Sequence, residues 1–395
     1  MRYAALDLPI TTENGYFTKG AALALEAEVA LHGASYIEMG SEDYYKEVMS
    51  CSEELFKLGY TLDEDYQKMF NNYDYASTSN EIIFALWRSS DITTYADTPM
   101  QGIAPNAEMN VLHDFAWPKL VQNFLGWGDR WPSQDLVDEY EVIDRDGEAK
   151  KWNETSYYQD YVNNPGKYWV SEHLYKHRDN RFYASIAHDS TYIYDNLIVT
   201  RITGNMHRNS LNKHSTYSTK SGYFIRKTLY ENEPIYAKNY TNYHHVILRL
   251  GRSYLNYAEA CLRLNEKDKA VEYINKTRTV HGGLPAHNAT LMTLDDAWKA
   301  YKSERRVELF FEGDRYWSLL RWGKADNLKE IPELNHGFTT IEISADGHSY
   351  DIINTPEVHN NNIRAFSEKR YLFPIPKKEL DLNENLKNDQ NIGWN

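Results

Sequence analysis

The strongest constraint on the fold is a stretch from Arg249 to Trp322 whose apolar residues recur at helical spacing. Between Leu250 and Cys261 they return every three or four positions, as on one face of an amphipathic helix. The pattern breaks at Asn265, where a second helix is about to begin. Small residues at Ala258 and Ala270 suit the close approach of two antiparallel helices. The stretch therefore predicts a helix hairpin with the spacing of a tetratricopeptide-like unit.

A third helix, expected from Leu294 to Phe311, carries the most conspicuous charge pattern in the chain. Glu304, Glu308 and Glu312 follow one another at intervals of four, so their carboxylates share a helix face and repel one another unless cations compensate them. The candidate cations are Arg305 and Arg315 nearby, and Arg249, Arg252, Arg263 and Arg278 in the hairpin.

These carboxylates allow two interpretations. Carboxyl groups on adjacent turns could form the acid and base pair of a glycosidase. Alternatively, they could belong to an ion network that joins one helix to another. The apolar neighbours from Leu309 to Phe311 favour the network, because they place the charges on a core-facing helix and buried charges persist when they are paired.

Four blocks of sequence carry a resemblance to a known family. They are LRLGRSYLNYAEACLRL, INKTRTVHGGLP, SERRVELFFEGDRYWSLLRWG and the closing RYLFPIPKKELDLNENLKNDQNIGW. Together and in this order they are similar to the SusD/RagB family of nutrient-binding proteins of Bacteroidetes. The resemblance covers nearly the whole chain, although Glu384 and Ile392 stand where the family usually has proline. It implies a mainly α fold, a SusD-like superhelix of tetratricopeptide-like helices.

The chain is predicted to divide into four parts. Residues 1–90 form the first part of the helical scaffold, with helices expected from Thr18 to Ser35 and from Asp43 to Leu58. Residues 91–245 form a long loop-rich insertion, and residues 246–330 complete the scaffold. Residues 331–395 form a loop and an extended C-terminal strap, in which a short helix is expected from Lys377 to Leu382.

The insertion is where a ligand would bind, because irregular segments on a rigid scaffold often carry the binding residues. Aromatic rings can stack on the apolar faces of pyranose units while nearby polar side chains bond to the hydroxyls. The best cluster is Trp127-Gly128-Asp129-Arg130-Trp131, since a glycine lets the backbone present a neighbouring ring outward. Each ring could instead belong to a small core of the insertion. The predicted ligand-binding residues are Trp127, Trp131, Trp117, Tyr95, Asp129 and Arg130.

Composition excludes some other functions. The formal net charge of -14 and the absence of a basic stripe argue against nucleic acid as a partner. The two cysteines, Cys51 and Cys261, lie in helical apolar patterns and are predicted to fill the core. No cofactor or metal is predicted, because phosphate-loop, dinucleotide and H-E-x-x-H motifs are absent from the sequence.

The sequence contains neither a visible signal peptide nor an apolar run of membrane-spanning length. Family members are similar surface lipoproteins that carry a signal peptide and an acylated cysteine ahead of their first helices. The resemblance therefore implies that this sequence lacks its N-terminal part. It also implies that a lipid anchor, rather than a spanning helix, places the protein at the outer membrane.

The predicted function is non-catalytic capture of an extracellular glycan or oligosaccharide at the cell surface. By resemblance, the captured nutrient would be delivered to a SusC-like TonB-dependent transporter. Two alternatives remain open. One is a glycoside hydrolase in which two of Glu304, Glu308, Asp129 and Asp135 act as acid and base. The other is a helical repeat that binds a protein through its concave face.

Overall fold

The computed structural model describes residues 8–10, 16–37, 39–106, 125–207, 219–231, 239–355, 357–359, 362–386 and 388–394 of the chain. The fold is mainly helical, which confirms the prediction from the sequence. Within these ranges, none of the helices has the length and apolar character that crossing a membrane requires.

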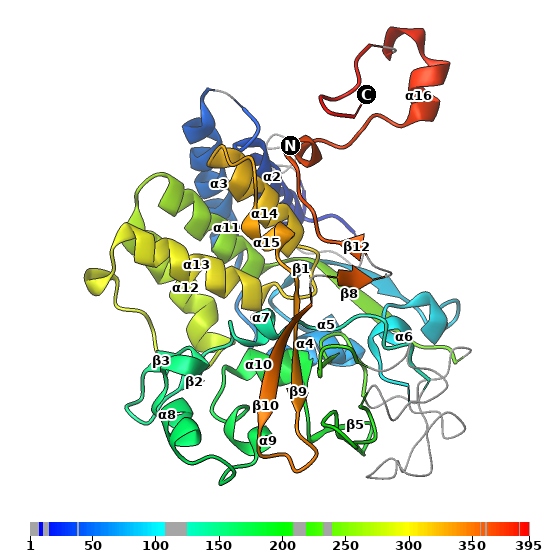
Figure 1. Cartoon of the computed structure of the whole chain (residues 1–395). Coiled ribbons are helices and arrows are strands. Elements are labelled where there is room, and N and C mark those ends of the chain that lie inside the picture. The colour runs from blue at the N-terminus through cyan, green and yellow to red at the C-terminus, as the bar shows by residue number, and fades with distance from the viewer. Residues whose placement is uncertain are drawn as a thin grey trace.

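Two antiparallel helix hairpins pack side by side to form the scaffold (Figure 1). The first consists of α2 (Lys19–Gly33) and α3 (Ser41–Leu55), and the second consists of α11 (Leu250–Arg263) and α12 (Lys267–Val280). Helix α11 lies against α3 and α2, and α13 (Leu294–Glu308) covers α11 and α12. The hairpin predicted from the helical periodicity after Arg249 is therefore present, and so are the two helices expected from Thr18 to Ser35 and from Asp43 to Leu58.

Small side chains allow the scaffold helices to approach closely. Ala258 on α11 and Ala270 on α12 are fully buried, and both belong to one apolar cluster that joins the two hairpins. Cys51 and Cys261 lie in the same cluster, and neither forms a disulfide, so both fill the core as predicted. Helix α2 begins at Thr18, whose hydroxyl accepts a hydrogen bond from the backbone N–H of Ala21.

Helix α13 is shorter than predicted. It ends at Glu308, and the residues up to Gly313 form turns before α14 (Arg315–Ala325) begins. Phe311 and Gly313 both have left-handed backbone angles, with φ of 61° and 73°. Glu312 therefore lies in the turn between the two helices and not on the helix that carries the other carboxylates.

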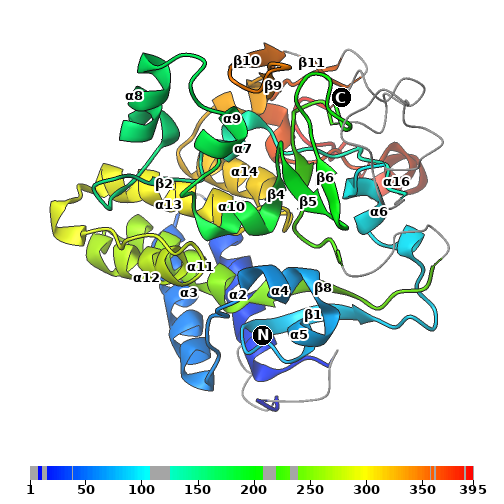
Figure 2. The same ribbon diagram turned by 90° about the horizontal axis from the view of Figure 1, so that it is seen from below.

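A two-stranded antiparallel ribbon marks the base of the insertion. Strand β1 (Ile82–Arg88) enters it and pairs with β8 (Tyr243–Arg249), which leads directly into α11. Between these strands the described chain forms short elements that lie on one side of the scaffold (Figures 1 and 2). The helices of more than one short turn there are α8 (Ser156–Asn163) and α10 (Asn180–Ser185).

The other short helices of the described chain are α4 (Tyr66–Asn71), α5 (Tyr73–Ser77), α6 (Met100–Ile103), α7 (Gln134–Val137), α9 (Val170–His173), α15 (Pro332–Asn335) and α16 (Lys377–Leu382). The other strands are β2 (Val142–Ile143), β3 (Ala149–Lys150), β4 (Ile186–Ala187), β5 (Thr191–Ile193), β6 (Asn196–Ile198), β7 (Phe224–Ile225), β9 (Phe338–Ile343), β10 (Tyr350–Thr355), β11 (Glu357–His359) and β12 (Asn362–Ile363). Each described sheet is a two-stranded antiparallel pair.

The C-terminal part is more structured than a loop and a strap. Strands β9 and β10 form a hairpin that extends from the scaffold along the insertion (Figure 1). Ile341 and Ile343 of β9 are buried in the same apolar cluster as Phe182 of α10. Further on, Tyr371 packs on the scaffold core and the Phe373 ring contacts Trp317 of α14, whereas the predicted helix α16 stands clear of the body (Figure 1). The expected strap therefore contacts the scaffold as far as Phe373.

Candidate functional site

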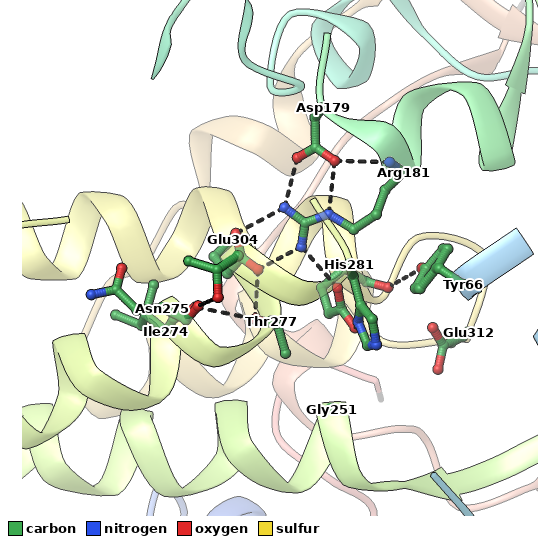
Figure 3. Close-up of polar contacts among 12 residues, drawn as sticks. Tyr66, Asp179, Arg181, Gly251, Ile274, Asn275, Thr277, His281, Glu304 and Glu312 are labelled. Atoms are coloured by element: carbon green, nitrogen blue, oxygen red, sulfur yellow. Dashed lines mark hydrogen bonds and ion pairs between the residues drawn. The ribbon is translucent and has the colours of Figure 1, made fainter. Parts of the chain in front are cut away.

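The glutamates of α13 are buried in an ion network rather than exposed in a cleft (Figure 3). Glu304 is 3% exposed and Glu308 is 0% exposed. Arg181 donates to both, with its Nη1 lying 2.5 Å from Glu304 Oε1 and 2.8 Å from Glu308 Oε2. Arg249 Nη1 lies 2.6 Å from the other oxygen of Glu308. The carboxylates that were candidates for acid–base catalysis are therefore held by guanidinium groups.

Cations reach this network from several distant elements. Arg181 lies in the first turn of α10 in the insertion, where its Nε and Nη2 also bond to Asp179 at 2.9 and 2.6 Å. Arg249 ends β8 and also binds Glu312, at 2.9 Å from Nε and 2.8 Å from Nη2. Lys227 binds the same carboxylate at 2.7 Å, and burial lowers the pKa of its ammonium to about 8. The network therefore joins the insertion, the ribbon and the scaffold.

His281 lies at the centre of the network, between two carboxylates. Its Nδ1 is 2.8 Å from Glu308 Oε1 and its Nε2 is 2.9 Å from Glu81 Oε2. Burial alone would lower the pKa of His281, but the charges of Glu308 and Glu81 outweigh this and raise it to about 9. The imidazole is therefore protonated at neutral pH and donates hydrogen bonds on both sides.

The Glu81, His281 and Glu308 side chains bring three ligand-type atoms within 4.8 Å of one another, as a metal site would. Here, however, both ring nitrogens of His281 are engaged in hydrogen bonds with the two carboxylates, so neither nitrogen is turned toward a shared ion. Arg249 Nη1 also occupies the space between the two carboxylates, at 2.8 Å from Glu81 and 2.6 Å from Glu308. The donor set fits a network of protons and guanidinium groups, and it does not fit a metal ion.

The expected cation partners were only partly correct. Arg249 does bind the carboxylates, but Arg305 pairs with Asp314 instead of Glu308, at 2.6 Å from Nη2. Arg315 has no ion pair with Glu312, whose partners are Lys227 and Arg249. The remaining candidates bind elsewhere: Arg252 contacts Glu28 and Asp314, Arg263 contacts Asp326, and Arg278 contacts Glu141.

The predicted aromatic cluster lies in an extended loop held against α6. The backbone N–H groups of Trp127, Gly128 and Asp129 donate to carbonyls of Gln101, Ala104 and Gly102 at 2.7, 2.9 and 2.9 Å. Just before this stretch, a Cβ on Gly126 would lie 2.0 Å from the carbonyl oxygen of Ala104, so only glycine fits there.

This backbone pairing leaves the polar and aromatic side chains of the loop facing outward. The Trp127 ring is 46% exposed, as the neighbouring glycines predicted. Asp129 and Arg130 are also exposed, and they form a loose ion pair at 3.9 Å. An exposed ring with adjacent charged groups is the kind of surface that can stack on a sugar and bond to its hydroxyls.

Two of the predicted rings differ from this pattern. Tyr95 is 1% exposed and belongs to an apolar cluster of the insertion, where its hydroxyl lies 3.3 Å from that of Tyr194. It is a core residue, and its ring cannot contact a ligand on the surface. Trp117 lies outside the residues that the structure describes.

Trp131 forms part of the wall of a cavity of about 930 Å³. The cavity lies between the Trp131–Leu136 segment, the α13–α14 turn, the region around α15, and the chain near Phe366. Its wall combines aromatic rings with charged groups. The rings are Trp131, Phe310, Phe311, Tyr316, Phe338 and Phe366, and the charged side chains are Asp135, Arg306, Asp314, Arg315, Glu333, Arg364 and Arg370.

Most of this wall was missed from the sequence. Phe310 and Phe311 were expected on the last turn of a core-facing helix, which instead ends at Glu308, and Tyr316 lies on α14 after the turn. The only available signal was the Glu312-Gly313 pair, because glycine ends a helix readily. Of the carboxylates named for a glycosidase, Asp135 is the one that lines this cavity, where its Oδ1 lies 3.3 Å from His336 Nε2.

Known proteins share this fold. A SusD-like protein of Bacteroides fragilis superposes with a TM-score of 0.74 at 22% identity, over 100% of this chain and 69% of that chain. A SusD-like carbohydrate binding protein of the same species has a TM-score of 0.71 at 22% identity, over 98% and 69%. Surface glycan-binding protein A of Bacteroides uniformis has a TM-score of 0.56 at 17% identity, over 97% and 64%.

The architecture is therefore that of the SusD-like helical proteins. The sequence agrees, because the model of the SusD family matches residues 80–394, and the chain belongs to this family. Among curated proteins, none matches the sequence.

Proposed function

We propose that this protein binds an extracellular glycan or oligosaccharide and delivers it, without cleavage, to a SusC-like TonB-dependent transporter. A lipid anchor would hold it at the outer face of the outer membrane. Membership of the SusD family supports this function, as do the carbohydrate and glycan binding stated in the names of two structural relatives. The delivery step, the anchor and the location rest on family resemblance.

The observation that carries the binding proposal is the cavity of about 930 Å³ beside Trp131. Its volume lies in the range of pockets that hold small ligands, and its wall alternates rings with polar groups. Trp127, four positions earlier, presents an exposed ring from the same loop. A glycan chain would place one sugar in the cavity and stack a neighbouring sugar on Trp127. Asp129 and Arg130 would bond to its hydroxyls.

A glycoside hydrolase is the alternative. Glu304 and Glu308 are unsuited to that role, because they are buried and their oxygens are bonded to Arg181, Arg249, Thr277 and His281. Asp129 and Asp135 are the remaining pair among the carboxylates named from the sequence. Asp135 lies at the cavity, so cleavage has to be measured together with binding.

The test is isothermal titration of the purified chain with a panel of soluble polysaccharides, with reducing ends assayed in the same samples. We expect binding without new reducing ends, and we expect it to weaken at least tenfold in Trp127→Ala and Trp131→Ala. Trp169→Ala is the matched control, because Trp169 is 44% exposed and lies in the insertion outside the cavity wall. Release of reducing ends that Asp135→Asn abolishes would establish the hydrolase instead.

A further inference from the structure

The cavity wall carries more uncompensated positive than negative charge. Four arginines line it: Arg306, Arg315, Arg364 and Arg370. Among the described residues, Arg306 alone of the four has an acidic partner, with its Nη1 lying 3.0 Å from Glu139 Oε1. The chain as a whole has a net charge of -14, so a hollow lined by arginines differs from the rest of the molecule. Such a hollow attracts anions.

Arg315 is the key group of this wall. It is the first residue of α14 and is partly buried, yet its guanidinium has no hydrogen bond or ion pair with any residue that the structure describes. Burial and the nearby charge of Arg306 lower its pKa to about 10, so it remains charged at neutral pH. A charged fork of N–H donors that is partly buried and lacks an acceptor is stabilised when an anionic oxygen group pairs with it.

The acidic groups of the wall do not neutralise this charge. Asp314 is already held by Arg305 at 2.6 Å and by Arg252 at 3.2 Å. Asp135 is in contact with His336. The charges of Glu333 and Glu139 also act on Arg315, but neither carboxylate is bonded to it. Glu333 on α15 is exposed to solvent, where water screens its charge, and Glu139 is bonded to Arg306 and Lys151.

Two further features make the wall suitable for an acidic sugar. The first turn of α14 lines the cavity, and the free backbone N–H groups and dipole of a helix N-terminus favour an anion. The second feature is the set of rings: Trp131, Phe310, Phe311 and Tyr316 offer apolar faces beside the cation, on which the ring of a sugar can pack.

We propose that the cavity binds an anionic sugar unit of an oligosaccharide, with the carboxylate or sulfate of that unit paired to Arg315 and its ring packed on the aromatic wall. This inference rests on the proposed function and specifies its ligand: an acidic glycan, such as a uronate-containing or sulfated chain, is preferred to a neutral one.

The test compares acidic ligands with a neutral one, and the oligogalacturonate and its carboxyl-reduced form differ only in charge. The wild-type chain is titrated with an oligogalacturonate, with the same oligosaccharide after reduction of its carboxyl groups, and with a sulfated dextran oligosaccharide. We expect the oligogalacturonate or the sulfated chain to bind at least tenfold more tightly than the carboxyl-reduced chain. The preference should shrink between about 50 mM and about 200 mM salt. Comparison of the oligogalacturonate with the sulfated dextran oligosaccharide distinguishes carboxylate from sulfate as the recognised group.

The variants locate the preference. Arg315→Gln should abolish the discrimination between acidic and reduced ligands, whereas Arg315→Lys should retain part of it because the charge is kept. Arg145→Gln is the matched control, since Arg145 is an exposed arginine outside the cavity wall. Urea unfolding of each variant verifies that it is folded. This is expected for Arg315, whose removal breaks no ion pair among the described residues, and for Arg145, whose ion pair with Asp160 is exposed.

The outcomes separate the two proposals. Equal binding of acidic and reduced chains, or discrimination that survives Arg315→Gln, would overturn the anionic-ligand inference and leave glycan binding intact. Failure of every acidic and neutral glycan to bind would overturn both.

Discussion

His281 makes the stability of the protein depend on alkaline pH in a predictable way. Its pKa is displaced from 6.5 to about 9 by Glu308 and Glu81, against the opposing effect of burial. A displacement of this size corresponds to about 3 kcal/mol of the free energy of unfolding. Because the pKa is raised in the folded state, this contribution is complete below pH 6.5 and disappears as the pH rises through about 9.

A second group masks this effect in the wild-type chain. Burial lowers the pKa of Lys227 from 10.5 to about 8, so the unfolded chain holds this proton more tightly than the folded one. Stability therefore increases between pH 8 and pH 10.5 as the unfolded state also loses the proton, with a sign opposite to that of His281. The wild-type profile alone cannot separate the two groups.

The measurement is urea unfolding of the wild type and of His281→Gln from about pH 6 to about pH 10. Lys227 is present in both proteins, so its contribution largely cancels in the difference between their free energies of unfolding. We expect this difference to fall by about 3 kcal/mol over the range. A difference that stays constant to within about 0.5 kcal/mol would refute the idea that a protonated His281 joins the two carboxylates.

Three further predictions concern the network and the loop. Arg181→Met leaves Asp179, Glu304 and Glu308 short of a cation in a buried site, so the free energy of unfolding should fall by about 3–5 kcal/mol. Arg145→Met removes an exposed ion pair and should leave the free energy of unfolding almost unchanged. Equal losses for Arg181→Met and Arg145→Met in urea unfolding would contradict the reasoning. Gly251→Ala should destabilise the protein, although alanine is normally better than glycine in a helix by about 1 kcal/mol, because its Cβ would lie 2.4 Å from Arg249 Nη1. A raised Tm would show that the network has room to adjust. Tyr95→Ala should lower the free energy of unfolding by about 3–5 kcal/mol, because this ring lies in a core, and Trp127→Ala should lower it by less than about 1 kcal/mol, because that ring is exposed. A larger loss for Trp127→Ala than for Tyr95→Ala in urea unfolding would contradict the assignment of one ring to the core and the other to the surface.

The sequence predicted best what depends on neighbouring residues. The hairpins of α2 with α3 and of α11 with α12 follow from apolar spacing, because a helix of that length must bury its apolar stripe on another helix. The end of α13 was missed because Leu309, Phe310 and Phe311 continue the apolar character of the helix. Their backbone instead turns, with Phe311 at a φ of 61°.

The exposure of individual rings could be predicted only where the backbone restricts them. Gly126 and Gly128 flank Trp127, and the tight packing of this stretch against Ala104 leaves the ring outside. Tyr95 has no such neighbours and is drawn into a cluster with residues far away in sequence, such as Ile193 and Phe224. The cavity could not be predicted, because its wall comes from separate segments that meet only in the folded chain.

The sequence predicted an ion network around the glutamates but did not identify most of the cations that pair with them. The reason for this indicates what the network does. Glu304 has to be compensated wherever it is buried, yet its partner Arg181 lies 123 positions earlier, in a segment without periodicity. An unpaired buried charge costs several kcal/mol, so these side chains are stable only when α10 lies in this position against α13. Apolar residues would tolerate a shift of a few ångströms, whereas a guanidinium that bonds to three carboxylates does not. The network thereby selects one placement of the insertion on the scaffold. Because both parts contribute to the wall of the cavity, the network also fixes the position of one part of the wall relative to the other.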